Sequence, residues 1–214
     1  RKQYEHYRNQ LLNFEGKEVE WKTLGEVCEF VRGPFGGAIK KNCFVASGYA
    51  IYEQQHAIYG NTDIRYFISD DKFKELKRFE VFPGDLIMSC SGTMGKIAII
   101  PENAPKGVIN QALLKLTVKN EISAKYLKYY FENTITQQMN DEARGGAIKN
   151  VASVDVLKKI KMPVPPLSEQ ERIVGILDQF DSLVNTELSA EIAARRKQYE
   201  YYREKLLTFE PLAN

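Results

Sequence analysis

Apolar side chains recur at helical spacing near both ends of this chain. Residues 1–15 read RKQYEHYRNQLLNFE and residues 196–210 read RKQYEYYREKLLTFE, so eleven of fifteen positions are identical at an offset of 195. In each copy the apolar positions advance by three, four and three, which places one apolar stripe along a helix. The pattern predicts that residues 1–20 are the end of one helix and that a second copy of it closes the chain. A longer parent with two such units is implied.

The second helix is predicted to begin at Ser168 and to continue to about Phe209. Three prolines between residues 163 and 166 exclude a helix there, and Ser168 with Glu171 forms a capping box. No Gly or Pro follows from Ile176 to Phe209, so an unbroken helix would be roughly 60 Å long. Three successive four-residue steps around residues 180–192 form a stutter in a coiled-coil pattern.

A lone helix of this length needs a partner to cover its apolar stripe. We therefore interpret the helix as a dimerisation stalk. The predicted partner-contact residues are Ile173, Leu177, Phe180, Val184, Leu188, Tyr199, Tyr202, Leu206 and Phe209.

Between the helices the pattern changes to β-branched and aromatic runs interrupted by Gly and Pro. Strands are predicted at residues 21–31, 64–68, 85–90, 96–100 and 112–118. Residues 91–95 have the Gly content of a hairpin connection, and residues 123–139 have helical spacing. The predicted fold class is mixed α/β. A strand-led globular domain occupies residues 21–166, and a long coiled-coil-forming helix occupies residues 167–214.

Composition narrows the class of protein. The chain has 214 residues, of which 43% are hydrophobic and 27% charged, values typical of a soluble globular protein. No apolar run is long enough for a membrane helix or a signal peptide. The N-terminus lacks Met, which favours a fragment of a longer protein. Three cysteines without a Cys-x-x-Cys pair predict reduced, mostly buried thiols in the cytoplasm and no zinc site.

Charge adds little. Residues 21–160 carry 19 Lys and Arg against 15 Asp and Glu, a net of +4, and the remaining residues carry 11 against 13, a net of −2. This bias weakly favours a polyanion partner for the middle of the chain.

The sequence matches none of the catalytic motifs with which we compared it. A phosphate loop at residues 90–97 would need Gly at Cys90 and Ser or Thr at Ile97. The sequence contains neither a methyl-donor loop nor a base-flipping motif. Residues 75–77 have the Glu-x-Lys pattern of a metal nuclease, but we interpret them as a solvated helix face. His6 and His56 are too few for a metal cluster. We therefore predict no catalytic residue, no metal and no cofactor on this chain.

Three segments combine Gly with basic, amide and aromatic residues: 32–42, 52–65 and 144–150. A Gly-rich loop alone is more often a simple turn. Amide side chains can pair with adenine, however, and Arg with guanine or phosphate. The predicted DNA-binding residues are Arg32, Lys40, Lys41, Gln54, Gln55, Asn61, Arg65, Arg144, Lys149 and Asn150.

One stretch carries a family resemblance. Residues 162–183, MPVPPLSEQERIVGILDQFDSL, resemble the junction between domain and helix in specificity subunits of type I restriction-modification systems. WKTLGEV at 21–27, PGDLIMS at 83–89, GTMG at 92–95 and NQA at 110–112 agree with it, so the resemblance covers nearly the whole chain. We expect PPLSEQ at 165–170 and GDLIMS at 84–89 to cap a helix, reverse the chain and pair strands rather than read DNA.

The resemblance implies a target-recognition domain that reads one part of a split double-stranded DNA site. It also implies a helix that pairs antiparallel with its twin and docks methyltransferase subunits, with the restriction subunit joining through the complex. S-adenosylmethionine, ATP and Mg²⁺ are then expected only on partner subunits, and no membrane is involved.

Family members typically carry two such units, whereas this chain has one complete unit and the tail of another. Half of a larger subunit and a half-sized subunit that forms a homodimer both remain open. A DNA-modifying enzyme with an unrecognised site and a coiled-coil scaffold are the alternatives from other classes.

Overall fold

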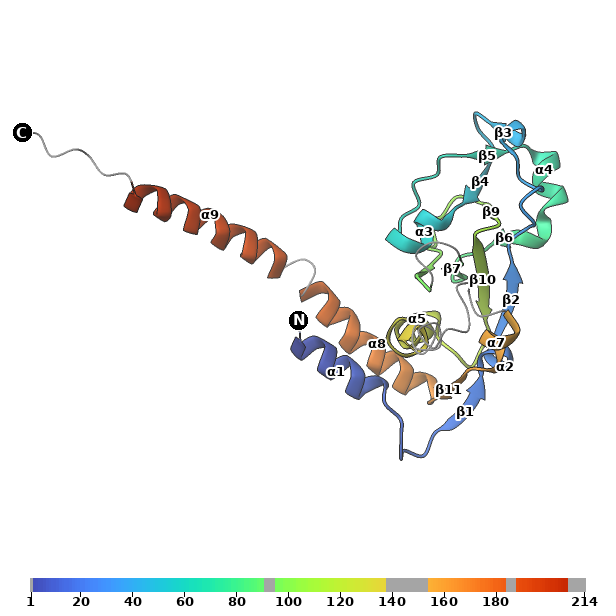
Figure 1. The fold of residues 1–214 in the computed structure, drawn as a ribbon. Helices are drawn as coiled ribbons and strands as arrows, with labels where there is room; N and C mark the ends of the chain where they lie inside the picture. Colours follow the sequence, from blue (N-terminus) through green and yellow to red (C-terminus); the bar gives the residue numbers. More distant parts are fainter. Residues whose placement is uncertain (1, 91–94, 138–153, 184–187, 208–214) are drawn as a thin grey trace, which may run out of the picture.

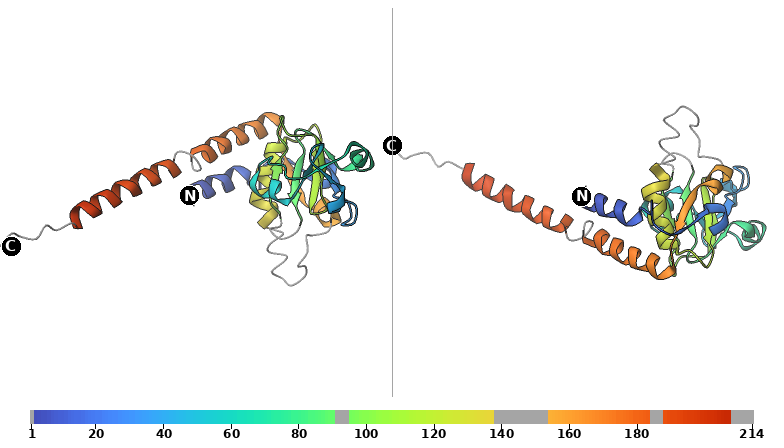
Figure 2. Two further views of the ribbon diagram at one scale, coloured as in Figure 1. Left: turned by 90° about the horizontal axis from the view of Figure 1, so that it is seen from above. Right: turned by 90° about the horizontal axis from the view of Figure 1, so that it is seen from below.

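A globular body with a projecting helical arm makes up the molecule (Figure 1). The computed structural model describes residues 2–90, 95–137, 154–183 and 188–207. Helices α8 (Leu167–Ser182) and α9 (Leu188–Leu207) extend away from the body, and α1 (Lys2–Leu12) lies beside α8 (Figures 1 and 2). The other helical segments are α2 (Leu24–Val27), α3 (Gln54–Tyr59), α4 (Asp70–Glu75), α5 (Ala124–Tyr130), α7 (Val154–Lys159), η1 (Lys41–Cys43), η2 (Lys77–Phe79) and the π-helical η3 (Phe131–Ile135).

The strands of the described residues form three sheets. A two-stranded antiparallel sheet joins β1 (Glu20–Thr23) to β11 (Lys161–Val164). A four-stranded antiparallel sheet has the order β2 (Cys28–Arg32), β10 (Leu113–Val118), β7 (Leu86–Ser89) and β8 (Ile97–Ile99). A five-stranded sheet has the order β3 (Phe44–Val45), β5 (Phe67–Ile68), β4 (Tyr49–Tyr52), β9 (Gly107–Ile109) and β6 (Glu80–Val81), with β4 and β9 parallel.

This architecture confirms the predicted mixed α/β class and the long helical part. The strands predicted at 85–90, 96–100 and 112–118 correspond to β7, β8 and β10. β7 and β8 are antiparallel neighbours, as a hairpin requires, although residues 91–94 of their connection lie outside the described residues. The predicted helix at 123–139 is present as α5 and η3 up to the end of the described segment at residue 137.

Three local predictions were wrong. The strand predicted at 21–31 is divided by α2, because the Glu26 carboxylate accepts hydrogen bonds from both Thr23 N and Thr23 Oγ1 at 2.6 Å and so caps a helical turn. The strand predicted at 64–68 is reduced to β5. The segment interpreted as a loop from residue 52 contains α3, which ends at Gly60 in the left-handed conformation that favours glycine.

The start of the arm also differs from the prediction. Pro166, not Ser168, is the N-cap of α8, and its carbonyl oxygen accepts hydrogen bonds from Glu169 N at 2.9 Å and Gln170 N at 3.1 Å. Proline is tolerated at the start of a helix, because the backbone N–H that it lacks would have no hydrogen-bond partner within the helix. The predicted continuity of the helix and its stutter fall on residues 184–187 and the adjoining side chains, which lie outside what the structure describes.

The largest hydrophobic core ties the arm to the body. Leu12 and Phe14, at 3% and 6% exposure, lie in one cluster with buried residues of the four-stranded sheet, α5 and α8. Two smaller clusters pack on the five-stranded sheet. The division of the chain at residues 20 and 166 stays a prediction, since all three predicted segments contribute to this main core.

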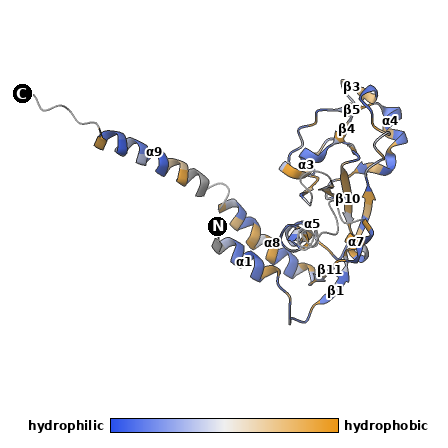
Figure 3. Ribbon diagram, in the orientation of Figure 1, coloured by the Kyte–Doolittle hydropathy of each residue, from blue (hydrophilic) through white to orange (hydrophobic). Residues whose placement is uncertain are grey.

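The apolar side chains described for α9 are exposed and lie away from this core. Figure 3 shows them on the arm, in a ribbon coloured by hydropathy. Among the described residues no helix is both long and apolar enough to cross a membrane.

Candidate nucleic-acid interface

The ends of strands from two sheets meet at one place. β2 ends at Arg32 and β7 at Ser89, and both lie beside the start of β10 in the antiparallel register. β4 and β9 run parallel and end together, with Tyr52 opposite Ile109. Because residues 110–112 connect β9 directly to β10, the two groups of strand ends adjoin. We call Arg32, Gly33, Glu53, Cys90 and residues 110–112 the strand-end junction.

Backbone hydrogen bonds hold this junction together. Gly33 N donates to Leu113 O at 3.0 Å, Cys90 N to Ala112 O at 2.8 Å, and Asn110 N to Tyr52 O at 2.9 Å. The Asn110 side chain accepts from Ala112 N at 2.9 Å. A Cβ on Gly33 would lie 1.9 Å from the Asn110 carbonyl oxygen, so only glycine fits there. The junction is therefore a closely packed crossing of chain segments.

Helix α3 leaves the junction through Glu53, its N-cap residue. The Glu53 carboxylate accepts from Arg65 Nη2 at 3.1 Å and Nε at 3.2 Å. His56 is buried, and its Nδ1 accepts from Glu53 N at 2.7 Å, while its Nε2 lies 3.2 Å from Asp63 O. His56 fixes the segment that follows α3 against its first turn, a structural role.

The structure brings part of the predicted DNA-binding set together. Arg32 is exposed at the junction, Gln54 and Gln55 are half-buried in the first turn of α3, and exposed Arg65 reaches Glu53. Lys40 and Lys41 are exposed but lie further along the chain, at η1 beside the edge strand β3.

Asn61 is half-buried, and its Oδ1 is buried without a hydrogen-bond partner among the described residues. The predicted positions Arg144, Lys149 and Asn150 lie outside those residues.

Two further exposed residues adjoin this set and were not chosen from the sequence. Gln111 is exposed in the link between β9 and β10. Phe35 is 96% exposed, three residues after Arg32. Both stood in segments already noted, but a sequence alone does not distinguish an exposed aromatic from a buried one in a Gly-rich loop. Exposure in the folded chain is the signal that identifies them.

The two buried thiols, Cys28 and Cys90, offer no reactive nucleophile. Burial raises the pKa of Cys90 to about 11, against the opposing effect of the neighbouring Arg32 guanidinium, and burial raises the pKa of Cys28 to about 12. Both thiols are therefore protonated at neutral pH. Cys28 and Cys90 are buried and Cys43 is half-buried, and none of the three forms a disulfide. Within the described ranges no group of three or more His, Cys, Asp or Glu residues is arranged to hold a metal ion.

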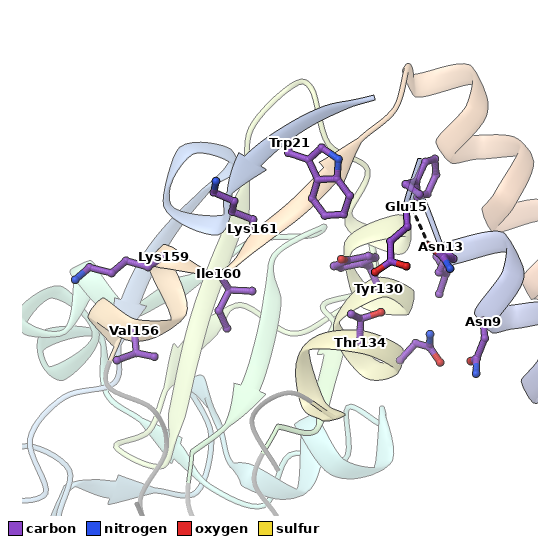
Figure 4. A pocket seen from close by; sticks show the side chains of 13 residues that line it. Asn9, Asn13, Glu15, Trp21, Tyr130, Thr134, Val156, Lys159, Ile160 and Lys161 are labelled. Carbon is purple, nitrogen blue, oxygen red and sulfur yellow. Dashed lines mark hydrogen bonds between the residues drawn. The ribbon is translucent and has the colours of Figure 1, made fainter. Parts of the chain in front are cut away.

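A groove of about 1060 Å³ lies elsewhere, between α1, the α5–η3 helix and the β1–β11 sheet (Figure 4). Trp21, 44% exposed, stands at its rim, and Tyr130 and Asn13 line it. None of the predicted DNA-binding residues within the described ranges lines this groove. It is thus separate from the strand-end junction.

The helical arm carries the second predicted set. Ile173 and Leu177 are fully buried in the core of their own chain. Phe180 is half-buried under α1, with ring centroids 6.0 Å from Tyr4 and 6.1 Å from Tyr7. Tyr4 Oη donates to Asp181 Oδ1 at 2.5 Å.

The rest of that set lies further along the arm. Tyr199, Tyr202 and Leu206 are exposed by 65%, 52% and 75%. Val184 and Phe209 lie outside the described residues, and the Leu188 side chain is likewise not described. A contact with a partner can therefore rest on the exposed residues of α9, while Ile173 and Leu177 are occupied within the chain.

Gln170, which the sequence placed in a capping stretch, fixes the start of the arm to the body. It is fully buried. Its Nε2 donates to Glu121 O at 2.9 Å and to Pro165 O at 2.8 Å, and its Oε1 accepts from Ser123 N at 2.8 Å. One amide therefore joins α8 to the turn before α5.

Residues 16–194 match the family model described as the type I restriction modification DNA specificity domain, and the chain belongs to this family. The predicted family is thereby confirmed.

Two curated relatives carry names of the same kind. A type I restriction enzyme specificity subunit of Haemophilus influenzae is 36% identical over 97% of this chain and 52% of its own length. Another, from Escherichia coli, is 32% identical over 98% of this chain and 53% of its own length. The chain therefore spans about half the length of these relatives.

The fold is similar to that of a solved chain from a study of complex assembly in a type I restriction-modification system. The TM-score is 0.70 at 20% sequence identity, over 92% of this chain and 48% of that one. The HsdS subunit from Thermoanaerobacter tengcongensis gives a TM-score of 0.65 at 21% identity, over 88% of this chain and 45% of that one.

Proposed function

We propose that this chain reads one part of a split double-stranded DNA target as one unit of a specificity subunit. The supporting observation is the strand-end junction, where exposed Arg32 lies on a strand end and Gln54 and Gln55 follow Glu53 in the first turn of α3. Side chains held on strand ends and helices are better positioned for base recognition than side chains on long loops. The body, residues 21–166, is the proposed target-recognition domain.

Each residue type has a distinct task in this proposal. Arg32 can pair with guanine, and the amides of Gln54 and Gln55 with adenine, whereas Lys40 and Lys41 supply phosphate contacts that set position. Arg65 is ion-paired with Glu53 in the free chain, so it reaches DNA only by exchanging that carboxylate for a phosphate or a base. Gln111 joins the proposed reading set.

Alanine variants test the assignment in the chain assembled with methyltransferase subunits. Lys40→Ala should weaken binding to all sequences and reduce the salt dependence of binding. Arg32→Ala or Gln54→Ala should relax preference at one base position, by about 1–3 kcal/mol. Lys161→Ala is the matched control, since Lys161 is exposed at the separate groove. Unchanged affinity and specificity in all three test variants would mean that another face binds DNA.

The partners follow from the same proposal. Methyltransferase subunits dock on the helical arm, and the restriction subunit joins through the complex in the cytoplasm. S-adenosylmethionine, ATP and Mg²⁺ act on those partners. Purified chain incubated with DNA and all three should show no turnover, and methylation or cleavage by this chain alone would contradict the proposal.

We also propose that α9 packs on a second unit, in another copy or in the same parent. Support comes from α1, whose sequence residues 196–207 largely repeat and whose Tyr4 and Tyr7 already pack against Phe180 of α8. By this correspondence Tyr199 and Tyr202 would take the place of Tyr4 and Tyr7 on α8 of the second unit. They are exposed here.

For the chain as given, light scattering should detect a dimer, and Tyr202→Glu should shift it to monomer. Tyr201→Glu is the matched control, because Tyr201 is also exposed but lies off the stripe, at the position equivalent to His6. A wild-type monomer at high micromolar concentration would argue against pairing between copies.

A further inference from the structure

Phe35 is an aromatic side chain that the fold holds outward. It is 96% exposed, yet both flanks of its turn are anchored. Pro34 is buried, and Ile39, 9% exposed, packs in the cluster that includes Ile51 and Phe73. The Phe35 carbonyl accepts from Ala38 N at 2.8 Å, which closes the turn. No other large apolar side chain among the described residues is as exposed, the next being Leu206 at 75%.

The two glycines beside it are not required by the fold. Neither Gly36 nor Gly37 has a positive φ, and a Cβ on either would meet no atom within 4 Å. Glycine in such a position only increases the entropy lost on folding. The glycine pair leaves room for the backbone of another molecule to approach closely, in contrast to Gly33, which the fold itself requires.

The charge around this turn fits a polyanion. Between Glu29 and Glu53 the sequence contains no Asp or Glu, while it contains Arg32, Lys40 and Lys41, all exposed. A sugar-phosphate backbone would therefore meet cations on both sides of the turn and no carboxylate from that stretch of sequence.

We propose that Phe35 is a base-stacking wedge: its ring inserts against the bases of bound DNA, and Gly36 and Gly37 let the sugar-phosphate backbone pass against the turn. This inference rests on the proposed DNA-reading function. Apolar side chains unstack base steps in this way, and stacking tolerates any base because the ring forms no directional hydrogen bonds. Phe35 therefore contributes affinity and local DNA distortion, while neighbouring polar residues supply the sequence preference.

The test uses the chain assembled with methyltransferase subunits and duplexes that carry 2-aminopurine at successive positions of the recognised half-site. Wild-type protein should raise 2-aminopurine fluorescence at one step, which reports unstacking. Phe35→Ala should abolish that rise and weaken binding about tenfold or more, without changing the preferred sequence. Phe35→Trp should keep both. Phe82→Ala is the control, since Phe82 is 54% exposed and outside this turn.

Gly36→Ala separates stability from binding. The folded chain has room for the added methyl group, so the unfolding midpoint should not fall, whereas affinity for every DNA sequence should drop. Wild-type affinity and fluorescence in Phe35→Ala would overturn the wedge and leave the DNA-reading proposal standing. Loss of methyltransferase assembly with unchanged DNA contact would also overturn it, by assigning the ring to a protein partner. Absence of sequence-specific binding by wild-type protein would instead contradict the proposed function.

Discussion

At the scale of single residues, a buried ion pair joins the two larger sheets. Lys115 on β10 and Asp85 have side chains that are 9% and 2% exposed, with Nζ 3.5 Å from Oδ2. Lys115 Nζ also donates to the backbone oxygen of Glu80 in β6 at 2.6 Å, and Asp85 accepts from Phe82 N at 2.8 Å and Thr117 Oγ1 at 2.5 Å. Because both side chains are buried from water, each charge is stabilised by partners within the protein.

Removing one partner should be costly. Lys115→Met leaves the Asp85 carboxylate buried without its cation, and we expect the free energy of unfolding to fall by about 3–5 kcal/mol. The double variant Lys115→Met with Asp85→Asn should recover part of this loss, because it removes both charges. Urea unfolding measures both, with exposed Lys161→Met as control. A change below about 1 kcal/mol in the single variant would contradict the assigned role of the pair.

Such residues mark the limit of prediction from one sequence. Lys115 stands in an apolar run that correctly predicted a strand, but its partner Asp85 belongs to another strand connection, and only the fold brings the two together. The same holds for Arg65, chosen as a DNA contact, whose guanidinium is engaged by Glu53 in the free chain.

At the scale of elements, the attachment of α8 depends on Gln170. Gln170→Leu would preserve the approximate volume but leave Ser123 N, Glu121 O and Pro165 O without their partner. Because an unpaired buried polar group costs about 1–3 kcal/mol, we expect a loss of about 3 kcal/mol in the free energy of unfolding.

Urea denaturation measures this loss, and hydrogen exchange should become faster at the Ser123 amide. Gln179→Leu is the matched control on an exposed position of the same helix. Equal stabilities of the two variants would show that the amide contacts contribute nothing.

Elements with a long, regular period were predictable, and those set by a local hydrogen bond were not. β10 and α5 follow from apolar spacing that tertiary packing reinforces. The single turn of α2 depends on the Thr23–Glu26 contact, and the start of α8 on the Pro166 carbonyl. α3 was missed because amide and Gly residues suggested a loop, whereas Glu53 and His56 cap it.

At the scale of the whole molecule, α8, the first helix of the arm, has a fixed direction relative to the body. Tyr129 on α5 donates to Asp178 at 2.7 Å and to Asp181 at 3.0 Å, and Tyr4 of α1 also donates to Asp181. Burial, together with these carboxylates, raises the pKa of the Tyr129 phenol well above its ordinary value, so it stays a hydrogen-bond donor. If two bodies sit at opposite ends of paired arms, arm length then sets the separation of the two half-sites.

An insertion tests this relation. Repeating Thr-Glu-Leu-Ser after Ser189 lengthens a helix by about 6 Å, which corresponds to one or two base pairs at about 3.4 Å each. The insertion also adds about 40° beyond a full helical turn, whereas two base pairs turn DNA by roughly 70°. We therefore expect unchanged half-sites, a spacer longer by one or two base pairs, and some loss of affinity.

Mapping methylated sites after assembly with methyltransferase subunits measures the spacer. An unchanged spacer would refute the relation, and changed half-sites would mean that the helix itself reads bases.

Because residues 1–15 and 196–210 repeat each other, a unit can be considered to begin before or after this helix. Leu12 and Phe14 complete the body's core from a stretch whose sequence recurs at residues 196–210. A polypeptide in which residue 210 is followed by residue 16 of a further unit would place Leu207 and Phe209 in the positions that Leu12 and Phe14 occupy here. In such a tandem polypeptide the repeated helix of the first unit would pack on the second body in the same way as residues 12 and 14 pack on the body here. Gene fusion or exchange within the repeat would thus swap whole bodies without opening either core.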